Sequence, residues 1–288
     1  IMGIKEPINR LPSWMKMKSR LPKDGDYYKV RELVDKNKLH TICTSGNCPN
    51  IGECWDSGTA TFMILGDVCT RSCKFCNVKT GRPGPVDTIE AQRIAESIVK
   101  MGLRHAVITS VDRDDLDDKG ASIWADTIRA CKKACPSLTI ECLIPDFDGI
   151  PELINQVINE KPEVISHNLE TVRRLSPEIR SRAKYDLSLQ VLQQIAQSGL
   201  ITKSGIMLGL GETKDEVINT MKDLLNVDCS VITIGQYMQP SRDHMPVKRW
   251  ITPDEFADFL RIGRDLGFKH IESDPLVRSS YHAEKHIK

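Results

Sequence analysis

Apolar, β-branched stretches alternate with stretches of helical periodicity along most of the chain, which is the pattern of βα units. The apolar runs lie at residues 61–68, 105–111, 138–144, 164–169, 202–209 and 231–237. The segments with helical periodicity lie at 88–101, 120–134, 151–160, 186–198, 213–225 and 253–266. Strands that are each followed by a helix predict a parallel sheet. We expect this sheet to curve into a partial barrel of six βα units, an α/β fold.

Two threonines mark expected helix starts. Thr88 precedes a run that begins with Ile89 and Glu90, and Thr213 stands three residues before Glu216. A threonine hydroxyl can accept a backbone N–H group at a helix start, and a glutamate three residues later can complete a capping box. We therefore expect helices to begin after Thr88 and Thr213.

The length of the chain fits one barrel with extensions at both ends. With 288 residues, of which 40% are hydrophobic and 27% charged, it has the composition of a soluble globular protein. We expect an N-terminal extension at 1–56, the barrel at 57–268 and a C-terminal extension at 269–288. No apolar run approaches the roughly 20 residues that span a bilayer, and the start lacks a signal-peptide core. The expected location is the cytoplasm, without membrane contact.

Charge is balanced overall but uneven along the chain. The formal net charge of +1 argues against a protein that neutralises nucleic-acid phosphates. Residues 1–40 nevertheless hold ten Lys and Arg against five acidic residues. This basic segment is either a solvated arm or a docking surface for an acidic partner. In the second case, charge reversal at Lys16, Lys18 and Lys23 weakens docking.

Ten cysteines are many for a cytosolic protein, where clustered thiols more often bind metal than form disulfides. Six of them form two close groups, which are Cys43, Cys48 and Cys54, and Cys69, Cys73 and Cys76. A structural zinc site needs four ligands, whereas each group offers three. Three thiolates suit a four-iron cluster with one iron left open, and a zinc loop or an electron-transfer cluster remain the alternatives.

The remaining cysteines are expected to pack in the core. They are Cys131, Cys135, Cys142 and Cys229. Cys131 and Cys135 share one face of a predicted helix and could bind a metal there. Buried cysteine is common in protein cores, so packing is the favoured interpretation.

The second cysteine group lies directly after the apolar run at 61–65, in a loop that leaves the carboxyl end of a strand. Barrels place their chemistry at that end. The C-x3-C-x2-C spacing of Cys69, Cys73 and Cys76 resembles the signature of the radical S-adenosylmethionine (SAM) superfamily. The resemblance implies a 4Fe-4S cluster on these cysteines, with SAM bound to the fourth iron through its amino and carboxylate groups. It also implies cleavage of SAM to a radical that abstracts hydrogen from an unactivated carbon.

Polar residues after the predicted strands are candidates for binding SAM. Thr109 and Ser110 resemble the family segment that contacts the SAM amino group, although they could also be helix-capping residues. Asn168 and Glu170 should share one face of a strand, because strand side chains alternate, and this pair suits a ribose diol. Arg180 stands where the family has an arginine that could pair with the SAM carboxylate. Its neighbours Arg173, Arg174 and Arg182 are alternatives for this role, and most of these arginines are expected to lie on a solvated face.

The first cysteine group is more specific. The C-x4-C-x5-C spacing of Cys43, Cys48 and Cys54 resembles the auxiliary-cluster motif of the lipoyl synthase family, and the similarity extends over nearly the whole chain. The run Arg278-Ser279-Ser280-Tyr281 resembles the family's RSSY motif. This resemblance implies a second 4Fe-4S cluster with Ser280 as its fourth ligand. The alternative for Ser280 is an ordinary hydroxyl in a polar tail.

The family resemblance implies a sulfurtransferase of lipoate biosynthesis. It would insert two sulfur atoms, taken from the auxiliary cluster, at C6 and C8 of an octanoyl chain on a lysine of a lipoyl carrier domain. The carrier would be the glycine cleavage H protein or the E2 lipoyl domain of a 2-oxoacid dehydrogenase. The electron donor would be a ferredoxin or a flavodoxin. Other possibilities are a radical SAM enzyme for a free small molecule and a non-catalytic cluster protein.

Overall fold

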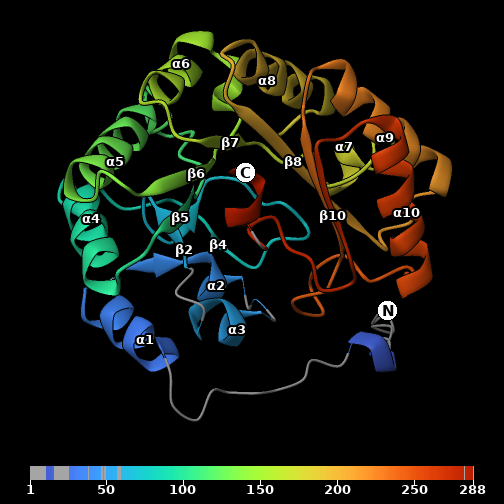
Figure 1. Cartoon of the computed structure of the whole chain (residues 1–288), viewed down its shortest axis with the longest axis horizontal. Helices are drawn as coiled ribbons and strands as arrows, with labels where there is room; N and C mark the ends of the chain where they lie inside the picture. The colour runs from blue at the N-terminus through green and yellow to red at the C-terminus, as the bar shows by residue number, and fades with distance from the viewer. Residues whose placement is uncertain are drawn as a thin grey trace, which may run out of the picture.

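The fold is seen in a computed structural model that describes residues 11–15, 26–37, 39–46, 48, 50–56, 60–281 and 283–287. The three lysines proposed for docking, Lys16, Lys18 and Lys23, lie outside these residues. Figure 1 shows a curved sheet surrounded by an outer ring of helices. The helices of this ring cover the outer face of the sheet, and the site lies on the inner side.

The main sheet has eight strands in the order β1-β2-β5-β6-β7-β8-β9-β10. The six strands of the expected βα units are β2 (Thr61–Ile64), β5 (His105–Ser110), β6 (Thr139–Leu143), β7 (Val164–Ser166), β8 (Ile201–Leu208) and β9 (Val231–Gln236). Each of them pairs in parallel with its neighbour in chain order. The expected α/β partial barrel is confirmed.

Two further strands extend this sheet at its edges. β1 (His40–Thr41) pairs antiparallel with β2, and β10 (His270–Ser273) pairs in parallel with β9. Two- and four-residue strands leave too short an apolar pattern to be recognised from sequence. A separate two-stranded sheet joins β3 (Val68–Cys69) to β4 (Lys79–Thr80), so that the second cysteine group begins inside a strand pair.

The helices of the βα units lie close to their expected positions. They are α4 (Glu90–Met101), α5 (Ala121–Ala134), α6 (Pro151–Asn159), α8 (Tyr185–Gln197), α9 (Lys214–Asn226) and α10 (Pro253–Leu266). Shorter helices are α1 (Asp26–Lys36), α2 (Ile42–Ser45), α3 (Ile51–Asp56), α7 (Ser176–Ile179) and the 3-10 turns η1 (Ser13–Met15), η2 (Phe147–Gly149) and η3 (Ala283–Ile287). Among the described helices, none is long and apolar enough to cross a membrane.

One of the two expected helix starts is confirmed. Thr213 caps α9, and Glu216 completes a capping box. The expectation for Thr88 is wrong, because the N-cap of α4 is Ile89 and its side chain makes no capping bond. Asp87 Oδ1 instead accepts the backbone N–H of Ile89 at 3.0 Å. A carboxylate one residue earlier therefore takes the place of the threonine hydroxyl.

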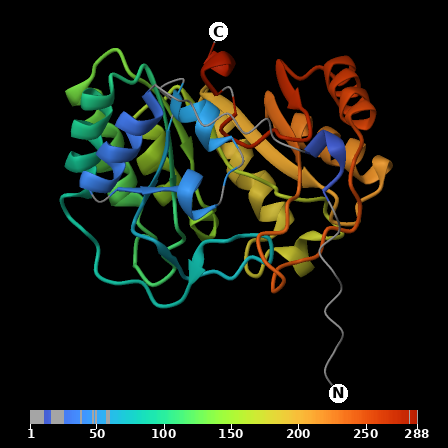
Figure 2. The same cartoon turned by 90° about the horizontal axis from the view of Figure 1, so that it is seen from below.

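The chain after β10 returns to the middle of the barrel. Pro275 O accepts the backbone N–H of Gln236 at 3.2 Å, which holds this segment beside the end of β9. Figure 1 shows η3 near the centre of the helix ring, and Figure 2 shows it on the side opposite the loop that follows β3. The C-terminal segment thus passes close to the interior of the barrel.

Candidate active site

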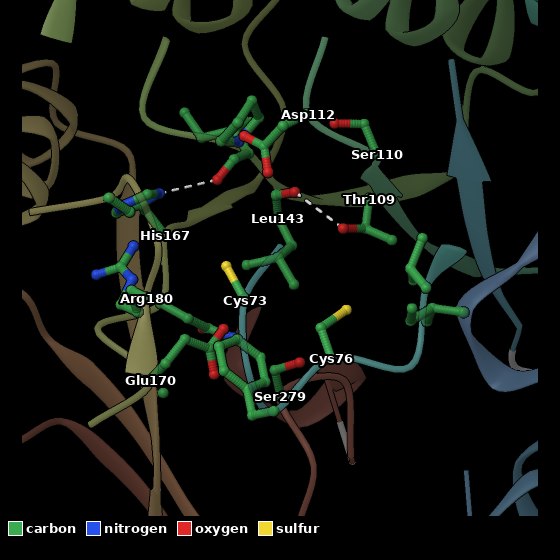
Figure 3. A pocket seen from close by; sticks show the side chains of 18 of the residues that line it. Cys73, Cys76, Thr109, Ser110, Asp112, Leu143, His167, Glu170, Arg180 and Ser279 are labelled. Atoms are coloured by element: carbon green, nitrogen blue, oxygen red, sulfur yellow. Dashed lines mark hydrogen bonds between the residues drawn. The ribbon is translucent and has the colours of Figure 1, made fainter. Parts of the chain in front are cut away.

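A cavity of about 310 Å³ opens at the carboxyl ends of the parallel strands. Its walls come from the loop between β3 and β4, the ends of β5, β6, β8 and β9, the segment after β7, and the C-terminal segment at 277–279. Parallel strands end at one edge of the sheet, so residues far apart in sequence meet there. Figure 3 shows side chains from these segments pointing into the cavity.

The second cysteine group lines this cavity. Cys69, Cys73 and Cys76 are half-buried, and all three border it. Burial raises the pKa of Cys69 to about 11 and that of Cys76 to about 12, and it also raises the pKa of Cys73. Three thiols in such a place become thiolates when a positive centre compensates the cost of burying charge. Iron supplies that compensation, so the donor set fits a cluster.

The described side chains of this loop are not arranged around a single metal ion. Among the described residues, no three His, Cys, Asp or Glu side chains lie close enough together to hold one ion. A zinc site requires all its ligands about 2.3 Å or less from one atom. Each thiolate of a four-iron cluster binds a different iron, so three such thiols surround a larger volume.

Two buried polar atoms fit the expectation of SAM in the same cavity. Asn168 Oδ1 and Ser110 Oγ border the cavity and lack a hydrogen-bond partner among the described residues. Buried polar atoms are nearly always paired, so both atoms suit a polar ligand. Thr109 also lines the cavity, but its hydroxyl donates to Leu143 O at 3.2 Å. Ser110 is therefore the hydroxyl with more hydrogen-bonding capacity to offer.

Asn168 and Glu170 lie together, but the expected reason was wrong. β7 ends at Ser166, and Glu170 has a positive φ of 65° with a single parallel bridge to Ile206. A loop turn, not strand alternation, therefore brings both side chains to the cavity. Burial raises the pKa of Glu170, while the charge of Arg180 and a hydrogen bond from Asn168 lower it.

Arg180 belongs to a buried hydrogen-bonded chain beside the cavity. Its Nη1 donates to Ser188 Oγ at 2.9 Å and to Leu169 O at 3.3 Å. His167 Nε2 lies 2.9 Å from Ser188 Oγ, and His167 Nδ1 lies 2.9 Å from Ile144 O. Because Arg180 has only donors, Ser188 accepts from it and donates to His167 Nε2, so Nδ1 carries the proton.

The first cysteine group lies next to this cavity. Cys43 is buried in α2, and its neighbour Ile42 forms part of the cavity wall. Cys48 and Cys54 are half-buried and pack against the same apolar core. Asn77 Nδ2 donates to Ser45 O at 2.9 Å, which ties the loop after Cys76 to α2. Both cysteine groups therefore border one region of the barrel.

The C-terminal motif reaches the same region. Arg278 and Ser279 line the cavity, and Ser280 follows them as a half-buried residue of the same turn. Asn50 Nδ2, between Cys48 and Cys54 in sequence, donates to Leu276 O at 2.8 Å. The positive charge of Arg278 lowers the pKa of Cys48 against the dominant effect of burial. The segment that leads into the motif is thus hydrogen-bonded to the loop of the first cysteine group, and the charge of Arg278 acts on Cys48.

Several residues at the site could not be assigned from the sequence. Asp112 and Asp146 line the cavity, and both carboxylates pair with the guanidinium of Arg71. His244 Nε2 lies 3.0 Å from Cys76 O. The sequence contained one hint of this ion pairing: an arginine stands inside the cysteine motif, and aspartates follow two of the predicted strands. Without the fold, those aspartates look like ordinary loop residues.

Among the remaining cysteines, core packing is confirmed for Cys131, Cys142 and Cys229, whereas Cys135 is half-buried.

Comparisons with known proteins agree with this site. Residues 63–224 match the family model described as the radical SAM superfamily. The chain is 57% identical over 282 residues to lipoyl synthase from Flavobacterium psychrophilum, covering 98% of this chain and 96% of the relative. It is 58% identical over 279 residues to lipoyl synthase from Bacteroides fragilis, covering 97% and 96%.

Solved structures that are similar in shape share much less sequence. The FeFe-hydrogenase maturase HydG from Carboxydothermus hydrogenoformans has a TM-score of 0.58 at 13% identity, covering 90% of this chain and 77% of that one. Methylornithine synthase has a TM-score of 0.52 at 13% identity, covering 86% and 76%. These likenesses show the fold alone. The near full-length relatives show more: this chain belongs to the lipoyl synthase family of the radical SAM superfamily.

Proposed function

We propose that this protein is a lipoyl synthase, a radical SAM sulfurtransferase. It inserts two sulfur atoms, at C6 and C8, into an octanoyl chain that is amide-linked to a lysine of a carrier protein. The observation that carries the proposal is the shared cavity. One cysteine group lines it, the other borders it through Ile42, and the C-terminal motif closes it through Arg278 and Ser279.

Each cysteine group has its own role in this proposal. Cys69, Cys73 and Cys76 hold one 4Fe-4S cluster, and Cys43, Cys48, Cys54 and Ser280 hold the other. When bound, the clusters and SAM supply the radical that takes hydrogen from the octanoyl chain and the sulfur that replaces it. The support for Ser280 is the contact of its segment with Asn50, inside the first cysteine group.

The polar side chains of the cavity orient SAM. Asn168 and Glu170 bind its ribose hydroxyls, and the hydroxyl oxygens of Ser110 and Thr109 accept hydrogen bonds from its amino group. Arg180 borders the cavity and would pair with the carboxylate of SAM. Its bond to Ser188 fixes the direction of its guanidinium group before SAM arrives. Such fixed donors lower the cost of ordering a bound molecule.

Apolar side chains form the rest of the wall and exclude water. Ile42, Met63, Val78, Ile144 and Met207 all border the cavity. Met63 and Ile144 are almost completely buried, with 1% and 3% exposure. An octanoyl chain fits apolar walls by the hydrophobic effect, and a dry cavity protects a reactive radical from side reactions. The walls thereby keep the reactive carbon apart from solvent.

The substrate is a lipoyl carrier protein in its octanoylated form. We propose the glycine cleavage H protein or the E2 lipoyl domain of a 2-oxoacid dehydrogenase as the carrier, and a ferredoxin or flavodoxin as the electron donor. The basic segment at 1–40 supports an acidic carrier, since opposite charge accelerates association. This proposal is tested by carrier binding at several salt concentrations, with charge reversal at Lys16, Lys18 and Lys23.

The activity is tested by anaerobic incubation of reconstituted protein with SAM, a strong reductant and an octanoyl-lysine peptide. Two four-iron clusters correspond to about eight irons per chain, and mass spectrometry should find two sulfur atoms added to the peptide. The Cys54→Ser variant is the matched control. It should still cleave SAM, because Cys69, Cys73 and Cys76 remain, but should add no sulfur.

Two other results would contradict the proposal. If the wild type cleaves SAM, which is seen as formation of 5'-deoxyadenosine, but adds no sulfur to any octanoylated carrier, the protein is a radical SAM enzyme with another substrate. If the loaded protein does not cleave SAM under strong reductant, it is a cluster protein without this chemistry.

A further inference from the structure

We propose that Arg71 is a positioning residue that sets the reduction potential of the cluster on the second cysteine group. It does so by holding two backbone N–H groups against the sulfur of Cys69. The inference rests on the proposed function, because it takes Cys69 as a cluster ligand. Arg71 itself lies between Cys69 and Cys73 and is not a ligand.

The side chain of Arg71 joins three separate loops. Its Nε and Nη2 donate to the two oxygens of Asp114, at 2.9 and 2.8 Å. Its Nη1 and Nη2 donate to the two oxygens of Asp146, at 2.8 and 2.7 Å. Asp114 follows β5 and Asp146 follows β6. One guanidinium therefore fastens the cysteine loop to the ends of two neighbouring strands.

The burial of this group makes the connection rigid. The side chain of Arg71 is 4% exposed, and those of Asp114 and Asp146 are 10% and 2% exposed. Bidentate pairs of this kind fix orientation as well as distance. The guanidinium also lowers the pKa of Asp146 to about 2, against the effect of burial. Arg71 lowers the pKa of Asp114 as well, so both carboxylates are ionised and bound near neutral pH.

Two backbone N–H groups converge on Cys69. The N–H of Arg71 donates to Cys69 Sγ with an N···S distance of 3.4 Å, and the N–H of Asp112 donates with a distance of 3.3 Å. One donor belongs to the cysteine loop and the other to the turn after β5. Hydrogen bonds to cysteine sulfur are one of the means by which a protein sets the potential of a cluster.

The bonds between these two segments keep both donors in place. The N–H and the hydroxyl of Thr70 donate to Asp112 O at 3.1 and 3.0 Å. The Thr70 hydroxyl in turn accepts the N–H of Asp114 at 3.1 Å. Arg71 pairs with the side chain of the same Asp114. Any movement between the loop and the turn would therefore stretch at least one of the two N–H···S bonds.

The direction of the effect follows from charge. A hydrogen bond withdraws electron density from a thiolate and favours the reduced cluster, which carries the additional negative charge. Weakening the two N–H···S bonds should therefore shift the midpoint potential to more negative values. A lysine keeps the positive charge but cannot form two bidentate pairs, so Arg71→Lys separates geometry from charge.

The test is an anaerobic redox titration of the reconstituted protein, followed by electron paramagnetic resonance. The signal that changes on addition of SAM identifies the cluster concerned. We expect Arg71→Lys to keep its iron and to have a more negative midpoint potential than the wild type. Arg71→Met should shift further, because it also removes a positive charge. Arg129→Lys, at an exposed pair with Glu160, is the matched control and should not shift.

A second variant distinguishes an effect on the reduction potential from a loss of folding. Thr70→Val removes the hydroxyl bonds between the loop and the turn without changing any charge, and should cause a smaller shift in the same direction. An unchanged potential in iron-loaded Arg71→Lys would overturn the proposal. Failure of both Arg71→Lys and Thr70→Val to load iron would also overturn it, because Arg71 would then serve folding only. The titration needs no octanoyl substrate, so its result is independent of whether sulfur is inserted.

Discussion

His167 shows at the scale of one residue how neighbours decide the charge of a buried group. It is 3% exposed, and its two ring nitrogens face Ile144 O and Ser188 Oγ. Burial and the nearby charge of Arg180 lower its pKa from the usual 6.5 to about 4. His167 is therefore neutral in the folded protein at pH values where it would be partly charged in the unfolded chain.

This difference makes stability depend on pH in a definite direction. Because the folded pKa is the lower one, the unfolded chain binds the proton first as pH falls below 6.5. The contribution of His167 is fully present above that pH and is lost down to about pH 4. The free energy of unfolding should fall by about 2 kcal/mol between pH 7 and pH 5 from this residue alone. Urea unfolding of the wild type and of His167→Gln, which does not titrate, would measure it. Equal pH dependence in both proteins would contradict the assignment.

Asn168 carries a prediction about ligand binding. Its Oδ1 is buried and lacks a hydrogen-bond partner among the described residues. Loss of one hydrogen bond to a bound molecule costs about 1–1.5 kcal/mol, which corresponds to about five- to tenfold in affinity. We expect Asn168→Ala to bind SAM about five- to tenfold more weakly in equilibrium dialysis, with its iron content unchanged. Asn219→Ala, on the exposed face of α9, is the control. Equal affinity in the two variants would exclude Asn168 from the SAM site.

At the scale of elements, the starts of α4 and α9 show when a short sequence motif predicts the N-cap of a helix correctly. Thr213 and Glu216 form both bonds of a capping box, whereas Thr88 makes no capping bond in α4. Both threonines precede helices, but at α4 it is Asp87 that accepts the first backbone N–H groups: its Oδ1 accepts that of Ile89 and its carbonyl oxygen accepts that of Glu90. A short motif therefore predicts a helix start well only when no stronger acceptor stands beside it.

The two threonines form a matched pair of substitutions. Thr213→Ala removes a capping hydroxyl and should lower the free energy of unfolding by about 1 kcal/mol. Thr88→Ala removes an exposed hydroxyl that caps nothing and should change it by less than about 0.5 kcal/mol. Chemical denaturation of both variants checks the difference. A loss at Thr88 as large as at Thr213 would mean that Thr88 does cap α4 in solution.

The C-terminal segment gives a second prediction at this scale. Asn50 holds it through Leu276 O, and a Cβ at Gly235 would come within 2.1 Å of Val277 O. Asn50→Ala and Gly235→Ala should both displace the segment that carries Ser280. Three thiolates still suit a cluster with one open iron, so we expect both variants to keep about eight irons per chain but to show an altered electron paramagnetic resonance signal from the first cysteine group, with SAM cleavage retained in Asn50→Ala. An unchanged signal in both variants would show that this segment contributes no ligand.

At the scale of the whole molecule, a buried ion pair connects two strands inside the barrel. Lys203 on β8 and Glu141 on β6 form an ion pair with N···O distances of 2.8 and 2.9 Å. Their side chains are 0% and 1% exposed, and β7 lies between their strands in the sheet. The pair therefore spans the concave face and connects strands that share no hydrogen bonds.

Removing one member of this pair should be costly. Lys203→Met leaves a buried carboxylate without its cation, so the free energy of unfolding should fall by about 3–5 kcal/mol. The double variant Lys203→Met with Glu141→Leu should recover much of that loss. Lys214→Met, at an exposed pair with Asp258, should cost less than about 1 kcal/mol. A double variant no more stable than Lys203→Met alone would show that the site needs the charges themselves.

What the sequence determined by itself was local. Hydrophobic periodicity located six strands and six helices, because burial on one face imposes a pattern on nearby residues. The spacing of the two cysteine groups indicated clusters, because ligands on one loop must follow each other at short intervals. Both features depend on residues that are close in the chain, and the fold and the family are confirmed.

What only the tertiary structure decided was which distant residues meet. The pairing of Arg71 with Asp114 and Asp146 joins residues 43 and 75 positions apart, and the bond from Asn50 to Leu276 joins residues 226 positions apart. No local pattern specifies such contacts, since they arise only when parallel strands end at one edge of the sheet. The same reason explains Glu170, which reaches the cavity from a turn with positive φ and not from a strand.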